Sequence, residues 1–565
     1  MKRCLRAIVI VPLMLQVACQ GLIEGPNGPG TGNSINAGVS GGSLGGADPF
    51  DSDVKAITAS VECKSGTVGV AAPLRALTKT QYGNTIRDLF AGQVTASTSF
   101  PQAQGASLTG FSSDSTMNSI SGGFAEGLAG AADDVALQVM NKLSAILPCS
   151  SAKNRACADT FVTTYATKAF RRPLAGDEKT ALLGLYDDAM AQHKNFGVAI
   201  AELTSTILQH PLFVYLPEIG TRTSGQRKLD DYELASRLSY LLTDTLPDAA
   251  LLSAAQAGQL STDAEVKTHA KRLIASDAFK AVLGRFVREW MHLKDVKPGD
   301  KDPTLFPEFD ATLASSMSQE LDRFVLSAVR KGAGGFEALI AGRETFVNAP
   351  LAKLYGATTS SKSADEWVPA TLEAERSGLL SRAAVLASYA GPTEPQHIFR
   401  GKFIRTGLLC DRIGAPPPGA SASQPSYPAG STRRQRSEIL QATQPCGACH
   451  KHMDAIGLGF DNFDAIGQRE AGNIDVSGNI TGNDEVAGQF QGSAELAAVF
   501  ADSEQVKECV GRQWFRYAFG RVEAASDSCT YAKVATDLGN SNGDLGAMFA
   551  SIAGADGFRF RKTID

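Results

Sequence analysis

The sequence predicts a mainly α-helical protein with several domains and a small β-hairpin near its C-terminus. A chain of 565 residues is long enough for several domains of about 100 to 200 residues each. Apolar residues recur at helical spacing through most of the chain beyond residue 51. By contrast, IDVSGNITGNDEVAGQFQG (474–492) sets Gly, Asn and Asp turn signals between short β-prone pieces, which predicts the hairpin.

The N-terminus has the features of an export signal. Lys2, Arg3 and Arg6 precede an apolar run that is too short to remain in a bilayer as a spanning helix. Cys19 stands where a bacterial lipoprotein is cleaved and acylated, and ordinary signal cleavage is the alternative. By resemblance to bacterial sorting rules, Gln20 after the cysteine indicates the outer membrane or the periplasm. We therefore expect an extracytoplasmic protein that contacts a membrane only through lipid on Cys19.

Three amphipathic stretches show the helical pattern. In LTKTQYGNTIRDLF (77–90), Thr78 and Gln81 have capping-box spacing and the apolar residues form one stripe. The stretch LDDYELASRLSYLL (229–242) repeats the pattern with acidic residues in its first turn. The third stretch is PEFDATLASSMSQELDRFVLSAVRK (307–331). We expect their apolar faces to pack in cores rather than to bind a cofactor.

Breaks in composition divide the chain into eight predicted segments. Residues 19–51 are rich in Gly, Asn, Ser and Pro, which is typical of a flexible tether. The stretch APPPGASASQPSYPAGS (415–431) can form neither a helix nor a central strand, so it predicts an extended connector. The segments are a signal peptide (1–18), the tether (19–51), an N-terminal helical module (52–148), three further helical modules (149–222, 223–358 and 359–432, the last ending in the connector), a CxxCH segment (433–480), and a C-terminal hairpin and helical module (481–565).

The ten cysteines predict disulfides as well as a functional motif. Four of them are set aside: Cys4 in the signal, Cys19 at the predicted anchor, and Cys446 with Cys449 in the CxxCH motif. The other six permit three disulfides in an oxidising compartment, and free buried thiols are the alternative. The suggested pairs are Cys149–Cys157, Cys509–Cys529 and, for the two that remain, Cys63–Cys410.

ATQPCGACHKHMDAIGLGFDNFDAIG (442–467) contains the only CxxCH motif of the chain. Covalent haem attachment requires two thiols one helical turn apart and an adjacent imidazole that can reach the iron. Cys446, Cys449 and His450 meet this requirement. A zinc site would need a second ligand pair at short spacing, a redox dithiol would need a βαβ setting, and a chance match is a third alternative. The sequence therefore predicts one haem c, with His450 as the iron ligand.

Motifs spread over almost the whole mature chain resemble a known family. They are PLRALTKTQYGNTIRDLFAG, KAFRRPLAGDE, LDDYELASRLSYLLTDTLPD, RSGLLSRAAVLAS with RGKFIRTGLLC, CGACHKHMDAIGLGFDNFDAIG, and RYAFGR with DGFRFR. In this order they resemble the multi-domain exported proteins of planctomycetes and myxobacteria, which consist of consecutive domains of unknown function and a cytochrome-c-like segment. The resemblance implies an exported, mostly helical, haem-bearing protein, but no substrate. Ala455 departs from the family's usual proline, and PTEPQHIFRGK departs in a way that leaves the role of His397 open.

A second axial ligand would decide what a haem on this motif can do. An iron with two protein ligands transfers electrons, whereas an open position permits oxygen or peroxide chemistry. Met453 lies on the same helical face as His450, so we expect it on the proximal side. Met548 is a candidate second ligand, but it belongs to an apolar stripe at helical spacing, so core packing is the favoured interpretation. His292 and His397 are the other candidates.

Other polar side chains of the CxxCH segment are expected to be structural. His452 points away from His450 around a helix, so we expect it to be solvated. Asp461 and Asp464 are spaced like a carboxylate pair, but nearby turn residues favour hydrogen bonds to local backbone. No catalytic residue is therefore assigned.

Two main classes of function follow. The first is electron transfer at the cell envelope, with a redox partner protein. The second is a haem-dependent oxidoreductase that acts on an extracellular substrate, and a surface interaction protein is a third, weaker class. The sequence contains no G-x-S-x-G, H-E-x-x-H, P-loop or Rossmann glycine pattern to support a separate enzyme domain. A net charge of -5 without a basic stripe excludes nucleic acid as the expected ligand.

Overall fold

Reciprocal side-chain caps begin two of the helices that the sequence predicts. At the start of α2 (Lys79–Leu89), the Thr78 hydroxyl accepts from the Gln81 backbone N–H, and the Gln81 side chain accepts from the Thr78 N–H, both at 3.2 Å. Asp230 and Glu233 form the same kind of pair at the start of α10 (Asp231–Leu242). Each pair satisfies backbone donors that a helix start leaves without partners. Both predicted helices are confirmed.

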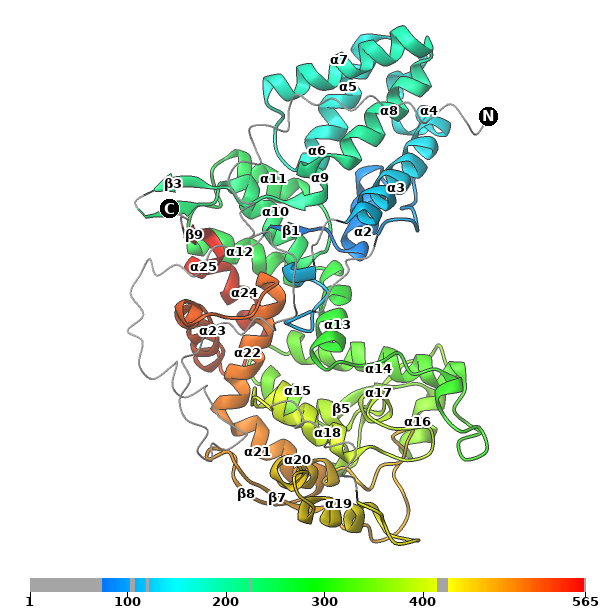
Figure 1. Cartoon of the computed structure of the whole chain (residues 1–565), viewed down its shortest axis with the longest axis vertical. Coiled ribbons are helices and arrows are strands. Elements are labelled where there is room, and N and C mark those ends of the chain that lie inside the picture. The colour runs from blue at the N-terminus through cyan, green and yellow to red at the C-terminus, as the bar shows by residue number, and fades with distance from the viewer. Residues whose placement is uncertain (1–73, 102–106, 118–120, 224, 414–424, 563–565) are drawn as a thin grey trace, which may run out of the picture. The chain divides into compact units, whose positions relative to one another are not determined.

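The computed structural model describes residues 74–562 apart from 102–106, 118–120, 224 and 414–424 (Figure 1). Helices dominate these residues and the strands are short, which confirms the mainly α fold class. The predicted signal peptide, the tether and Cys19 lie outside the described residues. The other helices are α3 (Gly122–Asn141), α4 (Leu143–Ile146), α5 (Arg155–Phe161), α6 (Thr167–Phe170), α7 (Gly176–His193), α8 (Phe196–Gln209), α9 (Pro211–Val214), α11 (Ala249–Gln256), α12 (Asp263–Ile274), α13 (Ala278–Trp290), α14 (Ala311–Arg330), α15 (Gly335–Ala341), α16 (Ala349–Tyr355), α17 (Ala383–Ser388), α18 (His397–Phe403), α19 (Arg433–Ala442), α20 (Gly447–Leu458), α21 (Gly492–Asp502), α22 (Glu504–Phe519), α23 (Ser528–Asn540), α24 (Leu545–Gly554) and α25 (Asp556–Arg559).

One hydrophobic core gathers the helices from α2 to α9, with α3 and α8 packed along each other. Tyr82 stacks on Phe100 in this core, with ring centroids 4.0 Å apart. Cys149 and Cys157 form a disulfide whose Cα atoms are 5.6 Å apart, so this predicted pair is confirmed. The bond joins α5 to the short helical turn that precedes it.

A second core joins the helices between α10 and α15 to the C-terminal helices. Trp514 of α22 is fully buried in this core, with its ring centroid 5.1 Å from that of Phe286 and 4.7 Å from that of Phe549. The indole N–H of Trp290 donates to the Gly407 carbonyl at 2.8 Å, so the core also reaches the segment after α18. A smaller hydrophobic cluster surrounds α14 and α16. The C-terminal helices therefore complete a core that the middle of the chain begins.

The strands form four small antiparallel sheets among the described residues. In the predicted hairpin, Ser477 pairs with Gln491 and Ile480 pairs with Gly488, which confirms the expected strands. Within the described residues, no helix is both long and apolar enough to cross a membrane. The sheets are β1 (Arg75–Ala76) with β2 (Tyr215–Leu216); β3 (Thr221–Thr223), β4 (Gln226–Lys228) and β9 (Phe560–Lys562); β5 (Glu344–Val347) with β6 (Val368–Thr371); and β7 (Ser477–Ile480) with β8 (Gly488–Gln491).

Glu218, which follows β2, gathers arginines from three other parts of the chain. Its carboxylate lies 2.7 Å from Nη1 of Arg237 in α10 and 4.0 Å from Nη2 of Arg75 in β1. Nε of Arg561 in β9 donates to the same carboxylate at 2.8 Å. The Arg237 guanidinium also lies 4.2 Å from the ring centroid of Phe558. One acidic side chain, only 11% exposed, thus connects segments that are far apart in sequence.

Two glycines let α18 and α20 cross at very short distance. A Cβ added to Gly401 would lie 1.9 Å from the Met453 carbonyl oxygen, and one added to Gly457 would lie 1.8 Å from the His397 carbonyl oxygen. These paired contacts also show that the two helices run antiparallel, because the earlier residue of one faces the later residue of the other. The glycines therefore fix the position of α20, which carries the CxxCH motif.

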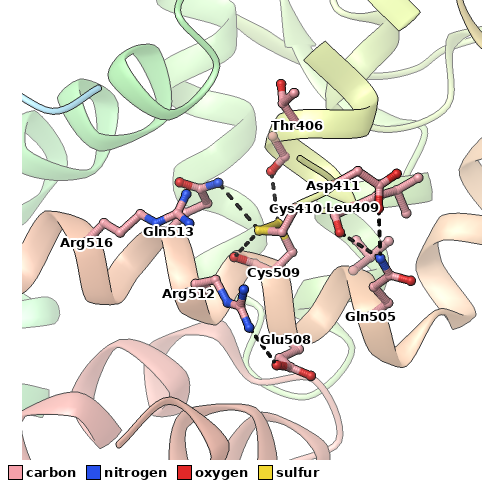
Figure 2. Close-up of a disulfide and its surroundings, with 12 residues drawn as sticks. Thr406, Leu409, Cys410, Asp411, Gln505, Glu508, Cys509, Arg512, Gln513 and Arg516 are labelled. Carbon is pink, nitrogen blue, oxygen red and sulfur yellow. Dashed lines mark hydrogen bonds and ion pairs between the residues drawn. A yellow bond between two sulfur atoms is a disulfide. The ribbon is translucent and has the colours of Figure 1, made fainter. Parts of the chain in front are cut away.

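A disulfide between Cys410 and Cys509 joins the segment after α18 to α22 (Figure 2). Their Cα atoms are 5.5 Å apart and both residues are buried. The predicted pairs Cys509–Cys529 and Cys63–Cys410 are therefore wrong, and Cys529 is in another disulfide. Tertiary packing explains the observed pairing, because α22 packs against the π-helical segment η7 (Ile404–Leu408) just before Cys410. Nearness in sequence favoured a pairing that this packing excludes.

Gly457→Ala should lower the free energy of unfolding by about 1–3 kcal/mol, because the added methyl group overpacks the crossing of α18 and α20. Gly539→Ala is the matched control, since nothing lies within 4 Å of a Cβ added to this helical glycine. It should instead raise the free energy of unfolding by about 0.5–1 kcal/mol. Denaturant titration followed by circular dichroism measures both values. Equal effects of the two substitutions would contradict the close crossing.

Candidate functional site

Cys446, Cys449 and His450 lie on one helical turn at the start of α20. Cys446 is the residue that precedes the helix and already has helical dihedral angles. Its carbonyl accepts from the backbone N–H groups of Cys449 and His450, both at 3.2 Å. Among the described residues, these two cysteines alone are free, and both are partly exposed. The structure therefore presents two thiols one turn apart, next to an imidazole.

A chain of hydrogen bonds holds the His450 imidazole. Its Nδ1 lies 2.9 Å from Oδ1 of Asp454, one turn further along α20. Oδ2 of Asp454 accepts from the Ser437 hydroxyl at 2.8 Å, and that hydroxyl accepts from the Gln441 side-chain amide at 2.9 Å. When Nδ1 carries the proton and donates it to Asp454, Nε2 is left as an acceptor. Within the described part of the chain, Nε2 has no hydrogen-bond partner.

These residues fit a covalently attached haem. Neither thiol is consumed in a disulfide, and the imidazole is oriented through Nδ1 with Nε2 available for iron. Burial, and then the charge of Cys446, raise the pKa of the Cys449 thiol, whereas a redox dithiol relies on a lowered thiol pKa. In the part of the chain that the structure describes, no group of three or more His, Cys, Asp or Glu side chains could hold a metal ion.

Asp454 and Ser437 are the site residues that sequence reasoning missed. The spacing of Asp454 from His450 could have revealed the first, because residues four apart face each other on a helix. Ser437 lies on α19, and no sequence pattern indicates that α19 packs against this face of α20.

Two of the proposed second ligands lie on or next to helices other than α20. Met548 is fully buried on α24, which packs mainly against α12 and α23. Core packing, the favoured interpretation of the apolar stripe that contains Met548, is therefore confirmed. His292 packs against Gly110, because a Cβ added to that glycine would lie 2.7 Å from Cε1 of the imidazole.

His397 lies close to the CxxCH helix but to one side of the motif. It is buried at the start of α18, and its carbonyl faces Gly457 in the C-terminal half of α20. Its Nε2 has no hydrogen-bond partner in the described regions. Burial lowers the pKa of His397, so the imidazole is neutral at pH 7. His397 and Met453 both lie closer than His450 to the C-terminal end of α20.

The expectation that His452 is solvated is wrong. Its side chain is buried, and Nδ1 lies 2.9 Å from the Thr481 hydroxyl, just after β7. The helical angle was correct, since His452 does face away from His450. The hairpin, however, covers that face of α20, and no local pattern could indicate this.

Asp461 and Asp464 make separate sets of contacts. Oδ1 of Asp464 accepts from the backbone N–H groups of Ile466 and Gln468, at 2.9 and 2.8 Å. The expected backbone role is therefore confirmed for Asp464. Asp461 instead accepts from Nε of Arg433 at 2.7 Å, which fixes the start of α19 against the turn after α20.

A polar groove of about 620 Å³ borders α20 on the face opposite the two cysteines. Ala455 and Leu458 supply the helix side of this groove, while Gln441, Asn479 and Gln491 supply amide groups from α19, β7 and β8. Gln441 therefore belongs both to the groove and to the hydrogen-bond chain that ends at His450. The groove lies beside the candidate site and does not contain it.

Five family models match consecutive parts of the chain, and each describes a protein of unknown function. In chain order they are DUF1587 (residues 75–141), DUF1595 (157–218), DUF1592 (229–357), DUF1588 (376–472) and DUF1585 (488–558). The DUF1588 match contains α18, α19 and α20, and so the whole hydrogen-bonded site. No curated protein and no solved structure matches the chain. The boundaries of the predicted segments stay predictions.

Proposed function

The chain is a multi-domain protein built from five consecutive domains of unknown function, and we propose that it carries one covalently bound haem c. Cys446 and Cys449 would form the two thioether bonds, and His450 would bind the iron. The proposed function is electron transfer at the cell envelope, to or from an unidentified redox protein. Export by the N-terminal signal, with lipid on Cys19, would place the protein at the outer membrane or in the periplasm.

The arrangement of the first turn of α20 carries this proposal. It combines two free thiols one turn apart with a histidine whose Nδ1 is held at 2.9 Å by Asp454. Covalent haem attachment requires these groups in this order, and the buried carboxylate supplies the orientation that a metal-binding histidine usually receives from a second partner.

A bound haem supplies an iron that takes up and releases one electron at a time. The protein's own contribution is to hold the attachment turn rigid. Asp454 fixes the imidazole, and the glycine crossing with α18 fixes the helix that carries it. A ligand held in this way would change its position little when the charge of the site changes.

A haem-dependent oxidoreductase acting on an extracellular substrate is the second candidate. The placement of the candidate axial ligands favours it. Met548 is fully buried on α24, which packs mainly against α12 and α23, and His397 lies toward the same end of α20 as Met453. A vacant position on the iron would allow small oxidants to bind.

The protein, produced in a host with periplasmic haem maturation, should carry haem that survives denaturing gel electrophoresis, because thioether bonds do not dissociate. Replacing both Cys446 and Cys449 by alanine should abolish haem staining of the band. The matched control is the replacement of both Cys149 and Cys157, which removes a disulfide and should leave the stain. A band of the first variant that still stains would show that the attachment site is wrong.

Carbon monoxide distinguishes the two candidate functions. An electron carrier whose iron has two protein ligands should be low-spin in both oxidation states, so carbon monoxide should barely change the absorption spectrum of the reduced protein. Met548→Ala should leave that spectrum unchanged and lower the free energy of unfolding by about 2–5 kcal/mol, because it empties a core position. Rapid carbon monoxide binding by the unmutated protein would contradict electron transfer as the function and support the oxidoreductase instead.

The proposed anchor predicts that Cys19 incorporates labelled fatty acid in bacterial cells. Cys19→Ser should abolish the label and release the protein to the soluble fraction, because acylation at this position supplies more than one chain. Cys4→Ser lies within the signal and should leave both label and membrane fraction unchanged. A Cys19→Ser protein that still sediments with membranes would refute the lipoprotein proposal.

A further inference from the structure

Asp454 is the most thoroughly buried charged group next to the CxxCH motif. Its side chain is 0% exposed, whereas that of His450 is 19% exposed. The Asp454 carboxylate therefore sits between the accessible imidazole and the interior, with one oxygen facing His450 and the other facing Ser437. A carboxylate that is buried so completely is shielded from bulk solvent, which strengthens its hydrogen bonds.

The surroundings of Asp454 leave its charge without a cationic partner. In the described part of the chain, no lysine or arginine forms an ion pair with it, and its only ion-pair contact is His450. Burial keeps nearby His397 neutral. The charge is thus balanced by two donors, the Nδ1–H of His450 and the hydroxyl of Ser437. A buried carboxylate in this situation draws strongly on the proton that His450 shares with it.

We propose that Asp454 is a positioning residue that makes His450 a strongly electron-donating ligand of the iron. A carboxylate that accepts the Nδ1–H of an iron-bound imidazole fixes its tautomer and raises the basicity of Nε2. A more basic ligand stabilises ferric iron over ferrous iron and so lowers the reduction potential. This inference rests on the proposed haem at Cys446, Cys449 and His450.

Ser437 and Gln441 set the strength of this effect. The Ser437 hydroxyl donates to the carboxylate at 2.8 Å and withdraws charge from it, and the Gln441 amide strengthens that donor by donating to Ser437 at 2.9 Å. Loss of the Ser437 hydroxyl therefore leaves Asp454 a better acceptor for His450. Loss of the Asp454 charge does the opposite. The two residues act on one imidazole with opposite signs, which a purely structural role would not produce.

The test is a redox titration of the haem-loaded protein, followed by its absorption spectrum. Asp454→Asn keeps the size of the side chain but removes its charge, so the reduction potential should shift to more positive values. Ser437→Ala should shift the potential to more negative values. The chain offers a matched control at Ser205, which donates to Asp133 at 2.7 Å and accepts from the Gln209 amide at 2.8 Å in another core. Ser205→Ala should leave the potential unchanged.

Haem staining separates failure of this inference from failure of the proposed function. If the unmutated protein does not stain, both the haem proposal and this inference are overturned. If every variant stains but neither Asp454→Asn nor Ser437→Ala shifts the potential, the haem proposal stands and Asp454 is only structural. If Asp454→Asn does not fold, Ser437→Ala decides alone: a negative shift supports the inference, and no shift or a positive one overturns it.

Discussion

The carboxylate of Glu218, whose side chain is only 11% exposed, joins several helical modules at one point. It lies among Arg75, Arg237 and Arg561, which come from the first, third and last matched parts of the chain or their edges. Three guanidinium groups around one acid would repel one another without it, and removing one partner from a buried ionic cluster is strongly destabilising. Glu218 therefore links Arg75, near the start of the described chain, to Arg561, near its end.

The candidate site depends on a second kind of constraint, which is the absence of side chains where α18 and α20 cross. Gly401 and Gly457 bring the two backbones together and thereby place α20 with one face toward α18 and another toward α19. On the face of α20 that packs against α19, the Ser437 hydroxyl donates to Asp454. The surroundings of the CxxCH motif are therefore built from three helices. Asp454, which orients His450, is buried because those helices pack closely.

Local signals predicted the features that depend on neighbouring residues. Thr78 and Gln81 form their capping box, the turn residues after Asp475 form the hairpin, and Cys149 bonds to Cys157 eight residues away. Such local signals could not predict contacts between segments that are distant in sequence. The burial of His452 under the hairpin, the bond between Cys410 and Cys509, and the contact of Ser437 with Asp454 all arise from helix packing. The sequence therefore indicated which turn bears the motif, but not which groups surround it.

The bond between Cys410 and Cys509 has a consequence for cleavage of the chain by a protease. These cysteines are 99 residues apart, and the loop that they close contains α19, α20 and the hairpin. A single cut anywhere in that loop, including the Pro-rich stretch before α19, leaves two fragments that are still covalently joined. The turn with Cys446 and Cys449 would then stay attached to the body of the protein until a reductant opens the bond or a second cut is made.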